Sequence, residues 1–138
     1  MTKKKILFTA IVMLIIVAGG VVYHEYNRSS PDVASLDAKP VTAENLFKDF
    51  QTNEQGANKM YLNRPLEVSG KVLEVKQNQD EPSQIILDCG DPFFGVACTL
   101  DKLQKSVHPG SLVTVKGICT GYLNDVIIIK SLLLNQKL

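Results

Sequence analysis

A chain of 138 residues with 45% hydrophobic side chains has room for one small domain with a modest core, and rarely for two. The net charge of +1 is unevenly distributed, because Lys3, Lys4 and Lys5 stand at the N-terminus and the rest carries 12 basic (15 − 3) against 14 acidic side chains. A mildly acidic domain disfavours binding to nucleic acid, which draws its affinity from a basic surface.

The first predicted element is an apolar helix. Residues 6–23 form a run of 18 residues without a charge, which as a helix would span about 27 Å, close to the ~30 Å hydrocarbon core of a bilayer. Three lysines precede this run, so the positive-inside rule places the N-terminus in the cytoplasm. Residues 1–26 are therefore predicted to be a single-pass transmembrane anchor, with everything after them extracytoplasmic.

The apolar run has two alternatives to a membrane anchor. Ala18, Gly19 and Gly20 supply the small residues of a cleaved signal peptide at a suitable distance from the lysines, so cleavage stays open. A lipoprotein signal is excluded at this position because no cysteine follows the apolar run. A buried helix of a soluble domain is disfavoured, since the run is apolar on every face.

A linker and an amphipathic helix are expected next. Residues 27–41 are rich in Ser, Pro, Asp and Ala and lack periodicity, which is typical of a tether. Thr42 is suited to cap a helix over residues 43–60, whose apolar side chains recur at helical spacing. Pro65 then takes the chain out of the helix. Residues 42–138 are predicted to form one domain.

Period-2 alternation after Pro65 predicts five strands. They cover residues 65–75, 83–89, 94–100, 111–121 and 125–134. Gly70 and Gly117 lie inside the first and fourth strands, where a missing Cβ lets a strand bend and approach its neighbour closely. The connection over residues 101–110 has room for one or two helical turns that plug a barrel end. This order predicts a mainly β protein, a five-stranded OB-fold Greek-key barrel preceded by one amphipathic helix and a transmembrane helix.

A family resemblance agrees with this fold. The segments PLEVSGKVLEV, VACTL and GSLVTVKGICTGYLNDVIII, with the anchor before them, resemble the tRNA_anti-like family of bacterial OB-fold proteins, which are membrane-anchored or lipoproteins. The resemblance covers about residues 43–134, and VKGICTGYLNDV is its most specific part. It implies a fold more securely than an activity, and it implies a bacterial inner membrane protein with a periplasmic domain. Many members carry a lipidated cysteine that this chain lacks.

Signs of catalysis are sparse. His24 and His108 are far apart, and the sequence contains none of the common nucleotide-binding, hydrolase or metal-binding motifs. We predict no catalytic residue, no metal site and no cofactor, and hence a protein that is not an enzyme.

Three cysteines permit a disulfide in an oxidising compartment. Cys89 and Cys98 flank a hairpin turn and could face each other across the second and third strands, whereas Cys98 and Cys119 would have to meet through the barrel interior. The pairing is left open. The alternative is three small buried side chains without a bond.

The predicted ligand surface is the usual face of an OB fold, formed by the second and third strands and the loops over residues 77–82 and 121–125. Phe93 and Tyr122 are the aromatic candidates for stacking on a ring, and Asn124, Lys76 and Gln77 are polar candidates in or beside these loops. Tyr122 has an alternative role, packing over the barrel end. The neighbouring Phe94 shares parity with buried positions and is assigned to the core.

Two functions of different class remain. The first is a binding module, with a protein or an oligosaccharide as its partner; nucleic acid is possible but disfavoured by charge and location. The second is a structural envelope protein whose barrel and helix dock onto another protein. The membrane is a partner in both, through the N-terminal helix. Neither fixes the oligomeric state.

Overall fold

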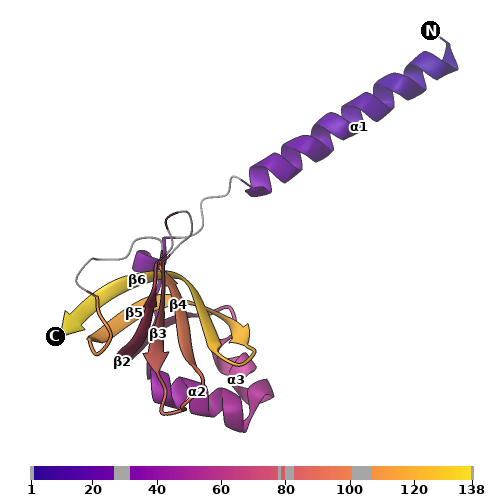
Figure 1. The fold of residues 1–138 in the computed structure, drawn as a ribbon. Helices are drawn as coiled ribbons and strands as arrows, with labels where there is room; N and C mark the ends of the chain where they lie inside the picture. The colour runs from indigo at the N-terminus through magenta and orange to yellow at the C-terminus, as the bar shows by residue number, and fades with distance from the viewer. Residues whose placement is uncertain (1, 27–31, 78, 80–82, 101–106, 138) are drawn as a thin grey trace. The chain divides into compact units, whose positions relative to one another are not determined.

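The structure is a computed structural model that describes residues 2–26, 32–77, 79, 83–100 and 107–137 (Figure 1). It divides into two compact units, residues 1–32 and residues 33–138. The first unit contains helix α1 (Lys3–Tyr26), and the second contains all the strands and the remaining helices. Each unit is described separately below.

Helix α1 is apolar on all sides. Within the described part of the chain, it is the one helix long and apolar enough to cross a membrane, with a mean hydropathy of 2.7 over its best window. The hydroxyl of Thr9, within the apolar run, donates to the carbonyl oxygens of Lys5 at 3.1 Å and Ile6 at 2.9 Å. Because that hydroxyl is satisfied inside the helix, it adds little to the cost of placing α1 in hydrocarbon.

The second unit is built around a closed barrel of five strands (Figure 1). The strands are β2 (Pro65–Lys76), β3 (Ser83–Asp88), β4 (Gly95–Leu100), β5 (Leu112–Tyr122) and β6 (Val126–Lys137). Neighbours follow the order β2-β3-β4-β6-β5, and β2 pairs again with β5 to close the barrel. All these pairs are antiparallel except β4 with β6. This is the predicted OB-fold barrel, and the fold prediction is confirmed.

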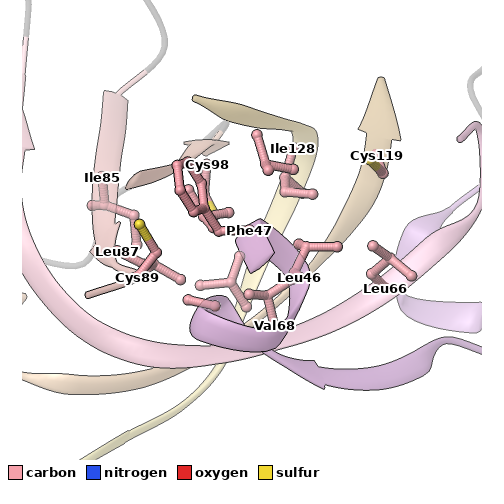
Figure 2. Close-up of a cluster of buried hydrophobic side chains, with 14 of the residues drawn as sticks. Leu46, Phe47, Leu66, Val68, Ile85, Leu87, Cys89, Cys98, Cys119 and Ile128 are labelled. Carbon is pink, nitrogen blue, oxygen red and sulfur yellow. The ribbon is translucent and has the colours of Figure 1, made fainter. Parts of the chain in front are cut away.

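Alternation along the strands fills the barrel with apolar side chains (Figure 2). In β3, Ile85 and Leu87 are completely buried, and the neighbouring outward positions are only half-buried. From β6, Ile128 enters the same core. Period 2 therefore identified the inward positions, because one face of each strand must leave water.

A side chain would be crowded at both predicted strand glycines, and more severely at Gly117 than at Gly70. A Cβ on Gly117 would lie 2.5 Å from Cγ2 of Ile128, 2.7 Å from Oγ of Ser131 and 2.9 Å from the carbonyl oxygen of Ile129. A Cβ on Gly70 would lie 3.0 Å from that of Ala43. Close approach of β5 to β6, and of β2 to the first helix of the domain, therefore depends on these glycines.

The predicted helix over residues 43–60 is two helices, α2 (Ala43–Thr52) and α3 (Glu54–Tyr61). Asn53 ends one and begins the other: its N–H donates to the Asp49 carbonyl at 3.0 Å, and its Oδ1 accepts from the N–H of Gly56 at 3.0 Å. A side-chain cap at this point competes with continued helix, which is why one amphipathic pattern yields two helices. Thr42 caps α2 as predicted, accepting from the N–H of Asn45 at 3.2 Å.

Ordered elements lie within the predicted linker of residues 27–41. The 3₁₀ helix η1 (Val33–Ser35) and strand β1 (Lys39–Thr42) belong to the second unit. Strand β1 runs parallel to the first half of β2, with Val41 opposite Val68, and so extends the sheet beyond the barrel. Its four residues are too few for a periodic signal to separate them from a tether.

The wall of the barrel holds η1 in place. Lys116 of β5 is only 7% exposed, and its Nζ donates to the carbonyl oxygen of Ala34 at 3.1 Å. Val33 is buried as well, at 5% exposure. The chain is therefore fixed to the barrel from the first residues of η1 onward.

Helices α2 and α3 cover the barrel end that lies beside the turns between β3 and β4 and between β5 and β6 (Figure 1). A plug had been expected instead from the connection over residues 101–110. Residues 101–106 of that connection lie outside the described residues, so that expectation stays a prediction.

Candidate binding surface at the barrel end

Tyr122, predicted as a stacking residue, is half-buried and packs against the core. Its ring lies 5.7 Å from that of Phe50 at an interplanar angle of 23°, and 5.8 Å from that of Phe47 at 78°. Both phenylalanines come from α2 and are buried. The ring of Tyr122 is thus occupied by the helix that closes the barrel, which corresponds to the second role considered for it.

A break in alternation explains this placement. Cys119 points inward, so strict period 2 would turn Tyr122 outward. The pairing register between β5 and β6 shifts between Cys119 and Gly121, and Gly121 has a φ of +137°. A bulge of this kind reverses the side-chain parity beyond it, which turns Tyr122 inward and leaves the next residue, Leu123, 79% exposed.

Phe93 is the most exposed aromatic side chain of the barrel unit, at 85%. The neighbouring Phe94 was predicted to be core, but it is 37% exposed, and its ring lies 6.4 Å from that of Phe93. The prediction for Phe94 is wrong because β4 begins at Gly95, so the alternation of the strand does not extend to position 94. We call Phe93, Phe94 and Leu123 the barrel-end patch.

Short hydrogen bonds fix the backbone beneath Phe93 and Phe94. Oδ1 of Asp91 accepts from the N–H of Phe93 at 2.8 Å and from that of Phe94 at 3.0 Å. Oδ1 of Asp88 accepts from the N–H of Gly90 at 2.9 Å. These aspartates form the local side-chain turns that shape the loop between β3 and β4.

Asp125 joins the second loop to the first. Its Oδ1 accepts from the N–H of Gly95 at 2.8 Å, and its carbonyl accepts from the N–H of Leu123 at 3.2 Å. Because β4 and β6 run parallel with Val96 opposite Val126, the loops that precede them open at the same end of the barrel. Phe93 and Leu123 each stand three residues before that matched pair.

The other predicted site residues are split between two ends of the barrel. Asn124 is exposed in the turn between β5 and β6, beside the barrel-end patch. Lys76 and Gln77 are exposed at the opposite end, since Lys76 pairs with Gln84 near the start of β3. Strand β3 separates the two ends by six residues, about 20 Å. The structure therefore does not bring the five predicted residues together.

The outward faces of β3 and β4, where OB folds commonly bind ligands, carry little recognition chemistry. Their half-buried outward side chains are Gln84, Ile86, Asp88 and Thr99. Ala97 between them is only 4% exposed. Across these two fully described strands, no aromatic ring and no cation points outward, so the stacking and phosphate contacts of nucleic-acid binders have no counterpart here.

All three cysteines are buried free thiols (Figure 2). The register places Cys98 opposite Ile85 and ends the hairpin at Asp88, so Cys89 lies at least three strand residues away, on the order of 10 Å. Cys98 and Cys119 flank Ile128 from opposite sides, which separates them by two strand spacings, about 10 Å. Both separations exceed the Cα distance that a disulfide bridges, about 7 Å.

A polar groove adjoins the barrel-end patch. It has a volume of about 550 Å³ and runs between α2, which contributes Glu44 and Lys48, and residues 89–92 of the β3–β4 loop. Burial raises the pKa of the Cys89 thiol in this groove, and the thiol donates to the Phe94 carbonyl at 3.1 Å. A thiol held in its neutral form is a poor nucleophile. Among the described residues, no group of three or more His, Cys, Asp or Glu side chains is placed to hold a metal ion.

The sequence match decides the family. The model of the tRNA_anti-like family matches residues 1–133, almost the whole chain. The chain belongs to the tRNA_anti-like family. The resemblance inferred from its strand segments is confirmed, and family members are OB-fold proteins of the binding type. None of the curated proteins compared with the chain matches it.

Two solved structures are similar in fold. One is a putative nucleic acid-binding lipoprotein from Klebsiella pneumoniae subsp. pneumoniae, 15% identical, with a TM-score of 0.48; the alignment covers 78% of this chain and 100% of that one. The other is from the crystal structure of yeast Stn1 and Ten1, 13% identical, with a TM-score of 0.46, covering 73% of this chain and 65% of that one. Family membership rests on the sequence match and not on these likenesses.

Proposed function

We propose that this protein is a membrane-anchored, non-catalytic binding module of the bacterial envelope, and that it docks onto another protein through the barrel-end patch. The observation that carries the proposal is the exposure of Phe93, at 85%, on a loop whose backbone is held by Asp91. Large apolar side chains at the centre of interfaces supply most of their binding energy.

Preorganisation supports docking at this end. An exposed phenylalanine on a loose loop loses conformational entropy when it binds. Here Asp88 and Asp91 already fix the loop, and Asp125 ties the neighbouring turn to it. Much of that entropic cost has thus been met in folding, so burial of the patch would translate more fully into affinity.

Anchoring is supported by α1 and the lysines before it. The helix has the length and hydropathy of a membrane span, and Lys3, Lys4 and Lys5 favour a cytoplasmic N-terminus by the positive-inside rule. The proposed location is the bacterial inner membrane, with residues 1–26 as anchor and the barrel in the periplasm.

Nucleic acid is a weaker proposal for the ligand. The outward faces of β3 and β4 offer neither rings nor positive charge, and the barrel-end patch lies among aspartates. A polyanion would be repelled by these side chains.

Site-specific photo-crosslinking tests the docking proposal. A benzoylphenylalanine replaces Phe93 or Leu123 in the full-length membrane protein in cells, and Leu73, 46% exposed on β2, is the matched control position. We expect adducts of discrete mass at positions 93 and 123 and none at 73. Equal labelling at all three positions, or adducts to nucleic acid, would contradict the proposal.

Protease accessibility tests the anchoring independently. Protease added to intact spheroplasts should remove the domain that follows α1 and leave a membrane-bound fragment. Protection of the domain until the spheroplasts are lysed would mean that the orientation is reversed.

A further inference from the structure

Carboxylates surround the barrel-end patch. Asp88 and Asp91 lie at or in the loop that carries Phe93 and Phe94. Asp125 comes two positions after Leu123 in the neighbouring turn. The three apolar side chains are thus flanked by acidic groups in both loops that carry them.

The groove beside the patch continues this acidic character. Glu44 lines it from α2, and Asp91 lines it from the β3–β4 loop, so its two walls each present a carboxylate. Lys48 is the one cation among the lining side chains, the others being polar or apolar. Pro92 lines the groove and immediately precedes Phe93, so the groove and the patch form one continuous surface.

We infer that this surface binds a protein segment in which an apolar side chain is flanked by lysine or arginine. The inference rests on the proposed function and names its partner chemistry. The apolar side chain packs on Phe93, Phe94 and Leu123, and a long cationic side chain extends along the groove between Glu44 and Asp91. A groove of about 550 Å³ is within the range of natural ligand sites, roughly 300–1,000 Å³.

The same charges argue against two other occupants. Phospholipid headgroups of bacterial membranes are often anionic, and the phosphates of nucleic acids always are, so both would meet carboxylates of their own sign. A cationic and apolar peptide segment gains from both parts of the surface, because opposite charge speeds encounter and apolar burial slows dissociation.

Selection from a random peptide library tests the inference. Dodecapeptides displayed on phage are selected against the full-length protein in nanodiscs, and the enriched peptides are synthesised and their affinities measured. We expect a consensus of an aromatic or aliphatic residue flanked by Lys or Arg. Phe93→Ala should weaken their binding about tenfold or more, the loss typical of a central apolar contact.

Charge reversal in the groove provides the matched comparison. Glu44→Lys should weaken binding about two- to fivefold, the range for exposed ion pairs, and should reduce the dependence of affinity on salt. Glu54→Lys is the control, because Glu54 lies in the first turn of α3 as Glu44 lies in the first turn of α2, is likewise exposed and does not line the groove. The affinity of the Glu54→Lys variant for the selected peptides should be unchanged.

The outcomes separate the two proposals. An acidic or neutral consensus, no enrichment, or equal losses for Glu44→Lys and Glu54→Lys would overturn the inferred charge of the partner, while crosslinking at position 93 would still support docking. Peptides that bind equally well to Phe93→Ala would overturn the inference together with the role of the patch.

Discussion

The same barrel end carries two groups of aromatic side chains with opposite environments. Tyr122 packs against Phe47 and Phe50 beneath helices α2 and α3, which cover this barrel end and are called the helical plug below. Phe93 extends from the adjacent loop with 85% of its surface exposed. Residue type does not separate these groups. Backbone position does, because a bulge turns one inward and a side-chain-capped loop holds the other outward. The first should contribute to stability and the second to recognition.

The largest effect is expected deep in the barrel. Gly117→Val places a branched side chain against Ile128 and the backbone of β6, with its Cβ 2.5 Å from Cγ2 of Ile128. We expect a loss of about 3 kcal/mol in the free energy of unfolding, at the upper end for overpacked sites. Urea unfolding measures it. Thr120→Val on the exposed side of the same strand is the control; it removes the hydrogen bond that the Thr120 hydroxyl donates to the Ile127 carbonyl at 3.3 Å and should cost less than about 1 kcal/mol.

Truncation of Tyr122, the β5 side chain beneath the helical plug, should have the next largest effect on stability. Tyr122→Ala removes the ring between α2 and the barrel, and we expect a loss of about 2 kcal/mol, less than for a fully buried aromatic because Tyr122 is half-buried. Urea unfolding again provides the measurement. A variant of unchanged stability but weakened partner binding would return Tyr122 to the role of a recognition residue.

Alkaline pH should lower the stability of the domain through Tyr61, which joins α3 to α2 in the helical plug. Burial, and then its hydrogen bond to Asp49, raise the pKa of Tyr61 from 10 to about 12; the hydroxyl donates to Oδ2 of Asp49 at 2.6 Å. The folded state therefore favours the neutral phenol, so this stability is fully present below pH 10 and is lost as the pH rises toward 12. At pH 11 the loss is about 1 kcal/mol.

Comparison with Tyr61→Phe isolates this contribution. Burial also raises the pKa of Cys98 to about 12, so both proteins should lose stability above pH 9. Between pH 9 and pH 11, the wild type should lose about 1 kcal/mol more than the variant. Parallel pH profiles would show that Tyr61 does not titrate differently in the folded and unfolded states.

The smallest effect on stability is expected at the barrel-end patch. Phe93→Ala removes a side chain that makes few contacts within the domain, so the free energy of unfolding should change by less than about 0.5 kcal/mol. Retention on a hydrophobic interaction column should decrease, because the exposed apolar surface is smaller. A destabilisation approaching that of Tyr122→Ala would mean that Phe93 stabilises the domain as Tyr122 does, and the distinction between the two groups of aromatic side chains would be lost.

The sequence predicted the barrel because its signal is strong and local. Alternation along β2, β3 and β5 reports which side chains leave water, and Gly117 marks the close approach of two strands. The same reasoning could not separate β1 from a tether, since four residues carry too little periodicity. It also missed the break between α2 and α3, where Asn53 makes two cap hydrogen bonds that a hydrophobic pattern does not record.

The candidate site was predicted only in part. Phe93 was identified because the predicted strands place this aromatic residue on the loop side of the barrel. Leu123 was missed because nothing in the linear pattern reveals the bulge at Gly121. Lys76 and Gln77 were placed with the site from the general arrangement of OB-fold loops, yet pairing register puts them at the far end of β3. Register depends on which residues meet across strands, and the sequence of one strand does not contain it.

If α1 anchors the protein as proposed, the contact between Lys116 and Ala34 limits how far the barrel travels from the membrane. Six residues, 27–32, separate the end of α1 at Tyr26 from the start of η1 at Val33, and six residues extend at most about 20 Å. The barrel therefore stays within a layer next to the membrane that is not much thicker than the barrel itself. A partner in the same membrane would meet it within that layer and not throughout the periplasm. Confinement to one layer raises the rate at which the two proteins meet, so a contact as small as the barrel-end patch would be occupied for more of the time than in free solution.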